Sequence, residues 1–203
     1  MSKIFTTPLA KNNPITVQVL GICSCLAVTA QLKPAFVMAL SVTIVVALAN
    51  LIISCLRNTI PPRIRIIVQL VVVSALVILV NQVLMAFVYD VSKQLSVYVG
   101  LIITNCIVMG RLEAFAMSNK PMESLMDGIG NGLGYGVILV ILGFVRELFG
   151  SGTLWGYPVM EKLGLYNIGY ENNGLVIMAP MALILVGIII WIQRSKDSEL
   201  QED

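Results

Sequence analysis

The chain has 203 residues, of which 58% are hydrophobic and only 12% are charged. Soluble domains carry about 25% charged residues, so this composition excludes an ordinary soluble enzyme. The formal net charge of +2 is too small to indicate a nucleic-acid partner. The sequence contains no histidine, which excludes haem and zinc sites built on imidazole ligands.

Six charge-free stretches take up most of the chain. A helix needs about 20 apolar residues to cross the hydrocarbon core of a bilayer, and its backbone polar groups have to be paired within the segment. The stretches therefore predict six transmembrane helices, over residues 12–32, 34–56, 66–89, 94–110, 128–145 and 172–193. Only short loops and tails remain, so we expect an all-α integral membrane protein with one membrane domain over residues 1–203.

Basic residues are unevenly divided between the two sides that six crossings define. The side with both termini holds nine of them, namely Lys3, Lys11, Arg57, Arg63, Arg65, Arg111, Lys120, Arg194 and Lys196. The opposite side holds four, namely Lys33, Lys93, Arg146 and Lys162. Because cytoplasmic loops are enriched in lysine and arginine, we expect both termini to be cytoplasmic.

The chain divides into two halves of three spans each, at about residues 12–89 and 94–193. The first span of each half carries a cysteine beside small or polar residues, Cys23 in one and Cys106 in the other. Three crossings are an odd number, so the second half is expected to be inverted relative to the first. Inverted repeats bring broken helices together near the midplane of the membrane. We therefore expect two inverted three-helix repeats.

Cys23 and Cys106 are the candidate ligands of a redox centre. Thiolates bind iron–sulfur clusters, with four needed for a [2Fe–2S] or [4Fe–4S] unit. The alternative is that each is an ordinary small hydrophobic residue. Cys106 lies five residues before Arg111, so the helix has to break near Thr104–Asn105 for both sulfurs to reach the same depth. Two cysteines are half of a ligand set, and a second protein would have to supply the rest.

Three glycines, Gly128, Gly132 and Gly136, fall four residues apart at the start of the fifth span. Their spacing differs from the G-x-G-x-x-G pattern of dinucleotide sites, and they open a membrane span instead of following a strand. Small residues four apart let two helices approach closely. We expect this face to pack against helices of a neighbouring protein of the same complex, the alternative being a broken helix that faces a ligand.

Several specific runs of residues extend over nearly the whole chain. They include Asn13-Pro14, Val19-Leu-Gly-Ile-Cys23-Ser, Arg63-Ile-Arg65-Ile-Ile, Gly100-Leu-Ile-Ile-Thr-Asn-Cys-Ile-Val-Met-Gly-Arg111 and Asp127-Gly-Ile-Gly-Asn-Gly-Leu-Gly134. In these runs the chain closely resembles the D subunits of bacterial sodium-translocating NADH:quinone reductases. The E subunit of the related Rnf electron-transport complex shares the run from Thr104 to Val108, but it differs in the glycine run and in its longer C-terminal tail.

The resemblance implies a membrane component of a multi-subunit translocase in the bacterial inner membrane, which oxidises NADH, reduces ubiquinone and moves sodium ions. It implies that Cys23 and Cys106 hold the iron of one [2Fe–2S] cluster, together with two cysteines of the paralogous E subunit. The flavins and the NADH site are expected on other subunits, so this chain has no complete catalytic site. Cys25 is an extra cysteine beside Cys23, and the Gly-x-Cys pattern favours Cys23 as the ligand.

Two other classes of protein compete with an electron-relay subunit, namely a small transporter built from an inverted repeat and a structural membrane scaffold. A transporter is expected to carry ionisable residues inside its spans. Here the acidic residues lie at span boundaries, in loops or in tails, with Asp127 and Glu147 nearest to the membrane. No basic residue is expected within a span near either candidate cysteine. Backbone N–H groups at broken helix ends would then have to compensate the charge of a cluster.

Overall fold

The computed structural model describes residues 13–87, 99–153, 155 and 174–196, and the regular secondary structure of these ranges is entirely helical. The termini and residues 88–98, where the two predicted repeats join, lie outside the described residues. The elements are α2 (Ile22–Val28), α3 (Leu32–Leu56), α4 (Arg65–Phe87), α6 (Val99–Ile103), α7 (Cys106–Arg111), the π-helix η1 (Leu112–Ala116), α8 (Pro121–Ser151), the 3-10 helix η3 (Gly174–Val176) and α10 (Ala179–Lys196). The predicted all-α class is confirmed for this part of the chain.

Three of the helices are long and apolar enough to cross a membrane, with spans at Leu32–Leu56, Arg65–Ala86 and Pro121–Ser151. These spans belong to α3, α4 and α8, and they match the second, third and fifth predicted spans. The shorter apolar helix α10 covers most of the sixth predicted span. The long charge-free runs of the sequence therefore predicted the principal helices correctly.

The first and fourth predicted spans are interrupted. In the first, residues 13–21 form turns and irregular backbone, and the seven-residue α2 begins only after Gly21. Val19 and Gly21 have φ angles of 56° and 78°, which lie in the left-handed region and cannot continue an α-helix. The prediction of a helix over residues 12–32 is therefore wrong for residues 13–21. In the fourth span, α6 ends at Ile103 and α7 begins at Cys106, so the predicted break at Thr104–Asn105 is confirmed.

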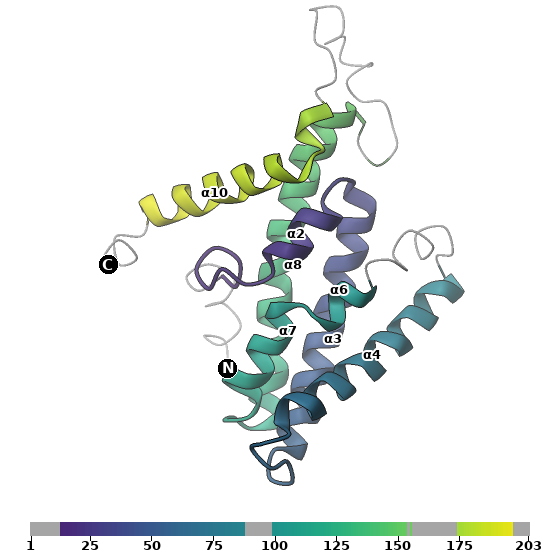
Figure 1. The fold of residues 1–203 in the computed structure, drawn as a ribbon, viewed down its shortest axis with the longest axis vertical. Helices are drawn as coiled ribbons and strands as arrows, with labels where there is room; N and C mark the ends of the chain where they lie inside the picture. The colour runs from purple at the N-terminus through teal and green to yellow at the C-terminus, as the bar shows by residue number, and fades with distance from the viewer. Residues whose placement is uncertain (1–12, 88–98, 154, 156–173, 197–203) are drawn as a thin grey trace, which may run out of the picture.

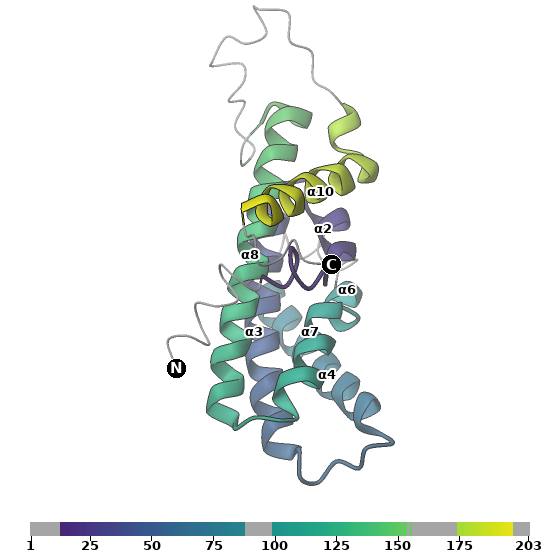
Figure 2. The same cartoon turned by 90° about the vertical axis from the view of Figure 1, so that its left-hand side faces the viewer.

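The central element of the fold is the pair formed by α3 and α8, which run side by side along the long axis in Figures 1 and 2. A Cβ atom added to Gly132 would lie 2.7 Å from the Cα of Thr43. The three glycines and the residues that they face on α3 are Gly128 with Ala47, Gly132 with Thr43, and Gly136 with Ala39. The two helices are thus antiparallel and touch through small residues. The predicted close approach is confirmed, but it occurs within this chain, so the expected contact with a neighbouring protein at this face is wrong.

The remaining helices surround this pair unequally. In Figure 1, α4 and α10 diverge from the α3–α8 pair. In the most apolar 18 residues of α4, 17% of the residues are buried, compared with 56% in the corresponding stretch of α3 and 61% in that of α8. The short helices α2 and α7 contact the central pair, and in Figure 2 they lie on one side of it. Both candidate cysteines are therefore carried by short helices that contact the central pair.

Candidate functional site

Cys106 is the first residue of α7, and its side chain is exposed. The preceding residue, Asn105, has an extended backbone and is fully buried. Its side-chain Oδ1 accepts a hydrogen bond from the backbone N–H of Ile107 at 3.3 Å. An asparagine N-cap of this kind pairs a backbone N–H that the first helical turn would leave unpaired. Asn105 therefore starts a new helix at the cysteine.

Cys23 is the second residue of α2, and it is also exposed. Cys25 lies two residues further along the same helix, where it is 0% exposed and belongs to the hydrophobic core. Residues two apart on an α-helix point about 200° away from each other. The short helix therefore turns Cys23 outward and Cys25 inward, a distinction that the sequence pattern alone left open.

The first turns of α2 and α7 pack against each other. A Cβ atom added to Gly21 would lie 2.8 Å from Cδ1 of Ile107 and 3.3 Å from Oδ1 of Asn105, so only glycine allows this approach without a shift. The Nδ2 group of Asn105 donates a hydrogen bond to Oγ of Ser24 at 3.4 Å. The structure thus brings together the two segments that carry the predicted site residues, and it leaves both of their thiols exposed.

A buried hydroxyl of α8 joins this contact, and Asn13 bonds the residue next to it in α8. The hydroxyl of Tyr135, in α8, donates a hydrogen bond to Oγ of Ser24 at 2.7 Å. Nδ2 of Asn13 donates to the carbonyl oxygen of Gly134 at 3.1 Å. Sequence reasoning did not single out Tyr135 or Asn13 as site residues. Tyr135 could have been identified as a tyrosine in a run otherwise dominated by glycine, because a buried tyrosine hydroxyl usually has a polar partner.

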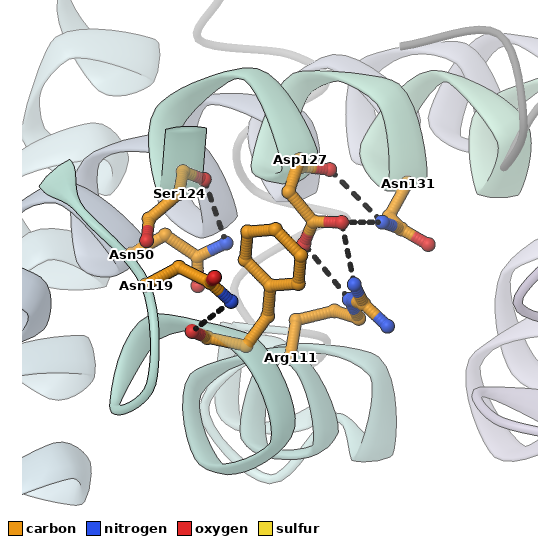
Figure 3. Close-up of polar contacts among 7 residues, drawn as sticks. Asn50, Arg111, Asn119, Ser124, Asp127 and Asn131 are labelled. Atoms are coloured by element: carbon orange, nitrogen blue, oxygen red, sulfur yellow. Dashed lines mark hydrogen bonds and ion pairs between the residues drawn. The ribbon is translucent and has the colours of Figure 1, made fainter. Parts of the chain in front are cut away.

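The C-terminal end of α7 is tied to α8 by a largely buried ion pair, shown in Figure 3, in which the side chains of Arg111 and Asp127 are 13% and 3% exposed. Nε and Nη2 of Arg111 donate to the two carboxylate oxygens of Asp127, at 2.9 and 2.5 Å. Nδ2 of Asn131 donates to the same carboxylate and to the carbonyl oxygen of Asp127, both at 2.9 Å. Two-pronged pairs of this type fix orientation as well as distance. α7 is therefore anchored near both of its ends, and the charges of Arg111 and Asp127 offset each other.

Arg146 is 1% exposed, within α8. Its Nη1 donates to the carbonyl oxygen of Leu26 at 3.3 Å and to Oγ1 of Thr29 at 2.5 Å, and its Nε donates to the carbonyl oxygen of Val176 at 3.2 Å. Among the described residues, no carboxylate forms a salt bridge with it. A buried positive charge thus lies at the C-terminal end of the helix that carries Cys23. The expectation that no basic side chain lies within a span near that cysteine is therefore wrong.

The described residues can supply at most part of a metal site. Within these ranges, no group of three or more His, Cys, Asp or Glu residues could hold a metal ion. Cys55 is exposed in the last turn of α3, away from the other cysteines in the sequence. The site can therefore present two thiols, those of Cys23 and Cys106, at the adjacent N-terminal ends of α2 and α7.

These features define a helical membrane protein whose central antiparallel pair supports two short, cysteine-bearing helices. A sequence model of the family described as "Rnf-Nqr subunit, membrane protein" matches residues 1–190. The chain therefore belongs to the Rnf-Nqr family.

Similar proteins of known name match over their full length. A protein of Proteus mirabilis (strain HI4320) is 56% identical over 205 aligned positions, covering 100% of this chain and 97% of the relative. Proteins of Shewanella sp. (strain W3-18-1) and Shewanella baltica (strain OS155) are each 55% identical over 202 positions, covering 100% of this chain and 96% of the relative. All three are named as the D subunit of a Na(+)-translocating NADH-quinone reductase. The resemblance predicted from the sequence runs is confirmed.

Proposed function

We propose that this chain is a membrane component of a bacterial sodium-translocating NADH:ubiquinone reductase, and that it passes electrons across the inner membrane. The observation that carries the proposal is the contact between the first turns of α2 and α7, which present the exposed thiols of Cys23 and Cys106. Relatives that are 55–56% identical over full length, and that are named as the D subunit of such a complex, support it.

The two thiols fit half of the ligand set of a [2Fe–2S] cluster. Such a cluster needs four thiolates, and two exposed cysteines on one surface suit a cluster shared with a second protein. When bound, the cluster would accept and release single electrons. Cys25 is fully buried in apolar surroundings, which favours Cys23 and Cys106 as the iron ligands of this chain.

Fixed positive charge lies near these ligands. A negatively charged centre in a low-dielectric interior is costly unless it is compensated. Backbone N–H groups that lack helical partners lie at the cysteine-bearing ends of α2 and α7, and the buried guanidinium of Arg146 lies at the opposite end of α2. The groups on and beside α2 would stabilise a thiolate at Cys23, and the backbone groups at the start of α7 would do so at Cys106.

Other proteins would complete the pathway. The paralogous E subunit would supply the other two cysteines, while the NADH site and the flavins would lie on the flavin-carrying subunits. This chain would contribute no complete catalytic site. Its exposed thiols and the small buried share of α4 favour a chain that is covered by neighbouring subunits and by membrane lipid.

The membrane topology that fits this role has six passes in a single membrane domain, made of two inverted three-helix repeats at about residues 12–89 and 94–193. Each half begins with an interrupted, cysteine-bearing segment, which is followed by one helix of the antiparallel α3–α8 pair. The division of basic residues into nine and four favours both termini on the cytoplasmic side.

The test uses the purified multi-subunit complex. Replacing Cys23 or Cys106 by Ser is expected to abolish NADH-driven quinone reduction, while NADH oxidation by an artificial acceptor continues. Cys25→Ser and Cys55→Ser are the matched controls, because one side chain is buried and the other is remote. Normal quinone reduction by the C23S and C106S complexes would show that these residues do not relay electrons.

A further inference from the structure

The hydroxyl oxygen of Ser24 lies where three helices meet. Ser24 is 0% exposed and follows Cys23 directly in α2. Its Oγ donates to the carbonyl oxygen of Gly21 at 2.8 Å and accepts from the hydroxyl of Tyr135 at 2.7 Å and from Nδ2 of Asn105 at 3.4 Å. A serine hydroxyl has one donor and two acceptor sites. All three sites are therefore used, and they join α2, α8 and the residue that starts α7.

The orientation of the Asn105 amide follows from the same bonds. Its Oδ1 accepts from the backbone N–H of Ile107, so its Nδ2 group is the one that faces Ser24. Because the next residue is Cys106, this amide connects the start of α7 to the residue beside Cys23. The two cysteine-bearing turns are thus joined by a hydrogen bond at the hydroxyl of Ser24, in addition to the packing of Gly21 against Ile107.

Neither short helix fixes its own position. α2 has seven residues and α7 has six, and isolated helices of this length are unstable. Tyr135, by contrast, belongs to the long helix α8, which has 31 residues and packs along α3. Its ring is fully buried, so the hydroxyl is held at a fixed point against Ser24.

We propose that Tyr135 is a positioning residue that sets the placement of Cys23 relative to Cys106 by way of Ser24 and Asn105. The inference rests on the function proposed above, since it concerns the geometry of the two cluster ligands. Tyr135 itself does not bind the iron. Its hydroxyl holds Ser24, and Ser24 holds the first turn of α2 against the start of α7.

Tyr135→Phe tests this directly, because it removes one oxygen atom and keeps the buried ring. In the assembled complex we expect a broadened electron paramagnetic resonance spectrum of the cluster, an altered reduction potential, and iron loss to a chelator that is several-fold faster than in the wild type. Ser24→Ala removes the same link from its other side and is expected to reproduce these changes. The double variant should match S24A, because S24A already removes the bond from Tyr135 together with the bonds to Asn105 and Gly21.

Thr16→Val is the matched control. The Thr16 hydroxyl is also buried, at 1% exposure, but it has no hydrogen-bond partner among the described residues, so this variant should keep the wild-type spectrum and rate of iron loss. If Y135F lowers the yield of complex, S24A decides the question alone. Spectra, potentials and iron loss in Y135F and S24A that match those of T16V would overturn the proposed positioning role. Persistence of the cluster signal in C23S would instead show that the proposed function itself is wrong.

Discussion

Gly132→Ala is expected to destabilise the central helix pair. The added Cβ would lie 2.7 Å from the Cα of Thr43, and ordinary contact begins at about 3.4 Å, so α3 and α8 would have to separate by about 0.7 Å at this point. The obstructing atom is backbone and cannot rotate away. Overpacking of this kind costs about 1–3 kcal/mol, and helix pairs in membranes depend on close packing of small residues.

A graded series of glycine substitutions makes the reasoning testable by thermal unfolding of the purified complex. Gly128→Ala should resemble Gly132→Ala, because its Cβ would lie 2.8 Å from the Cα of Ala47. Gly136→Ala should be milder, since the nearest atom would be a side-chain Cβ at 3.1 Å, and Gly187→Ala should be neutral, since no atom of the described part of the chain would lie within 4 Å. If all four variants unfold at the wild-type temperature, the close α3–α8 contact does not stabilise the protein.

Three further predictions concern buried charge and cofactor chemistry. Asp127→Asn should destabilise the chain by about 3–5 kcal/mol, because it leaves the Arg111 guanidinium in a buried site without its counter-charge. A variant that unfolds at the wild-type temperature would contradict this. Arg146→Met should lower the free energy of unfolding by about 1.5–3 kcal/mol, because charged hydrogen bonds to backbone carbonyls are lost. Arg146→Lys should retain part of that stability, and equal losses in both variants would argue against a role for the charge. If reduction of the buried cluster draws in a cation, its reduction potential in the intact complex should be higher in sodium than in potassium. Equal potentials would assign sodium coupling to another part of the complex.

The sequence predicted the long helices well because their signal is local. Runs without charge mark α3, α4 and α8, and the off-centre position of Cys106, five residues before Arg111, required the break near Thr104–Asn105 that the structure shows. The break before α2 was not foreseen. Gly21 lies in an apolar run where glycine is common. The left-handed backbone at Val19 and Gly21 occurs where Gly21 packs against Ile107, more than 80 residues away in the sequence.

The sequence predicted which helix face packs closely more readily than it predicted what that face, or a single side chain, contacts. The spacing of Gly128, Gly132 and Gly136 identifies a helix face, but it cannot tell whether the helix opposite belongs to the same chain. In the same way, the position of Arg146 near a span boundary gives no indication that it bonds the carbonyl oxygens of Leu26 and Val176. Such contacts are set by the tertiary fold. The outward and inward orientations of Cys23 and Cys25 also emerge only once α2 is placed on its neighbours.

The proposal that Cys23 and Cys106 supply half of a shared cluster is tested most directly by counting iron. The complete complex, purified with the wild-type chain and with a C23S/C106S chain, is compared for iron per complex and for the cluster's electron paramagnetic resonance signal. We expect the double variant still to assemble but to lose two iron atoms per complex, the content of one [2Fe–2S] cluster, together with the signal. Equal iron content and an unchanged signal in the two complexes would contradict it.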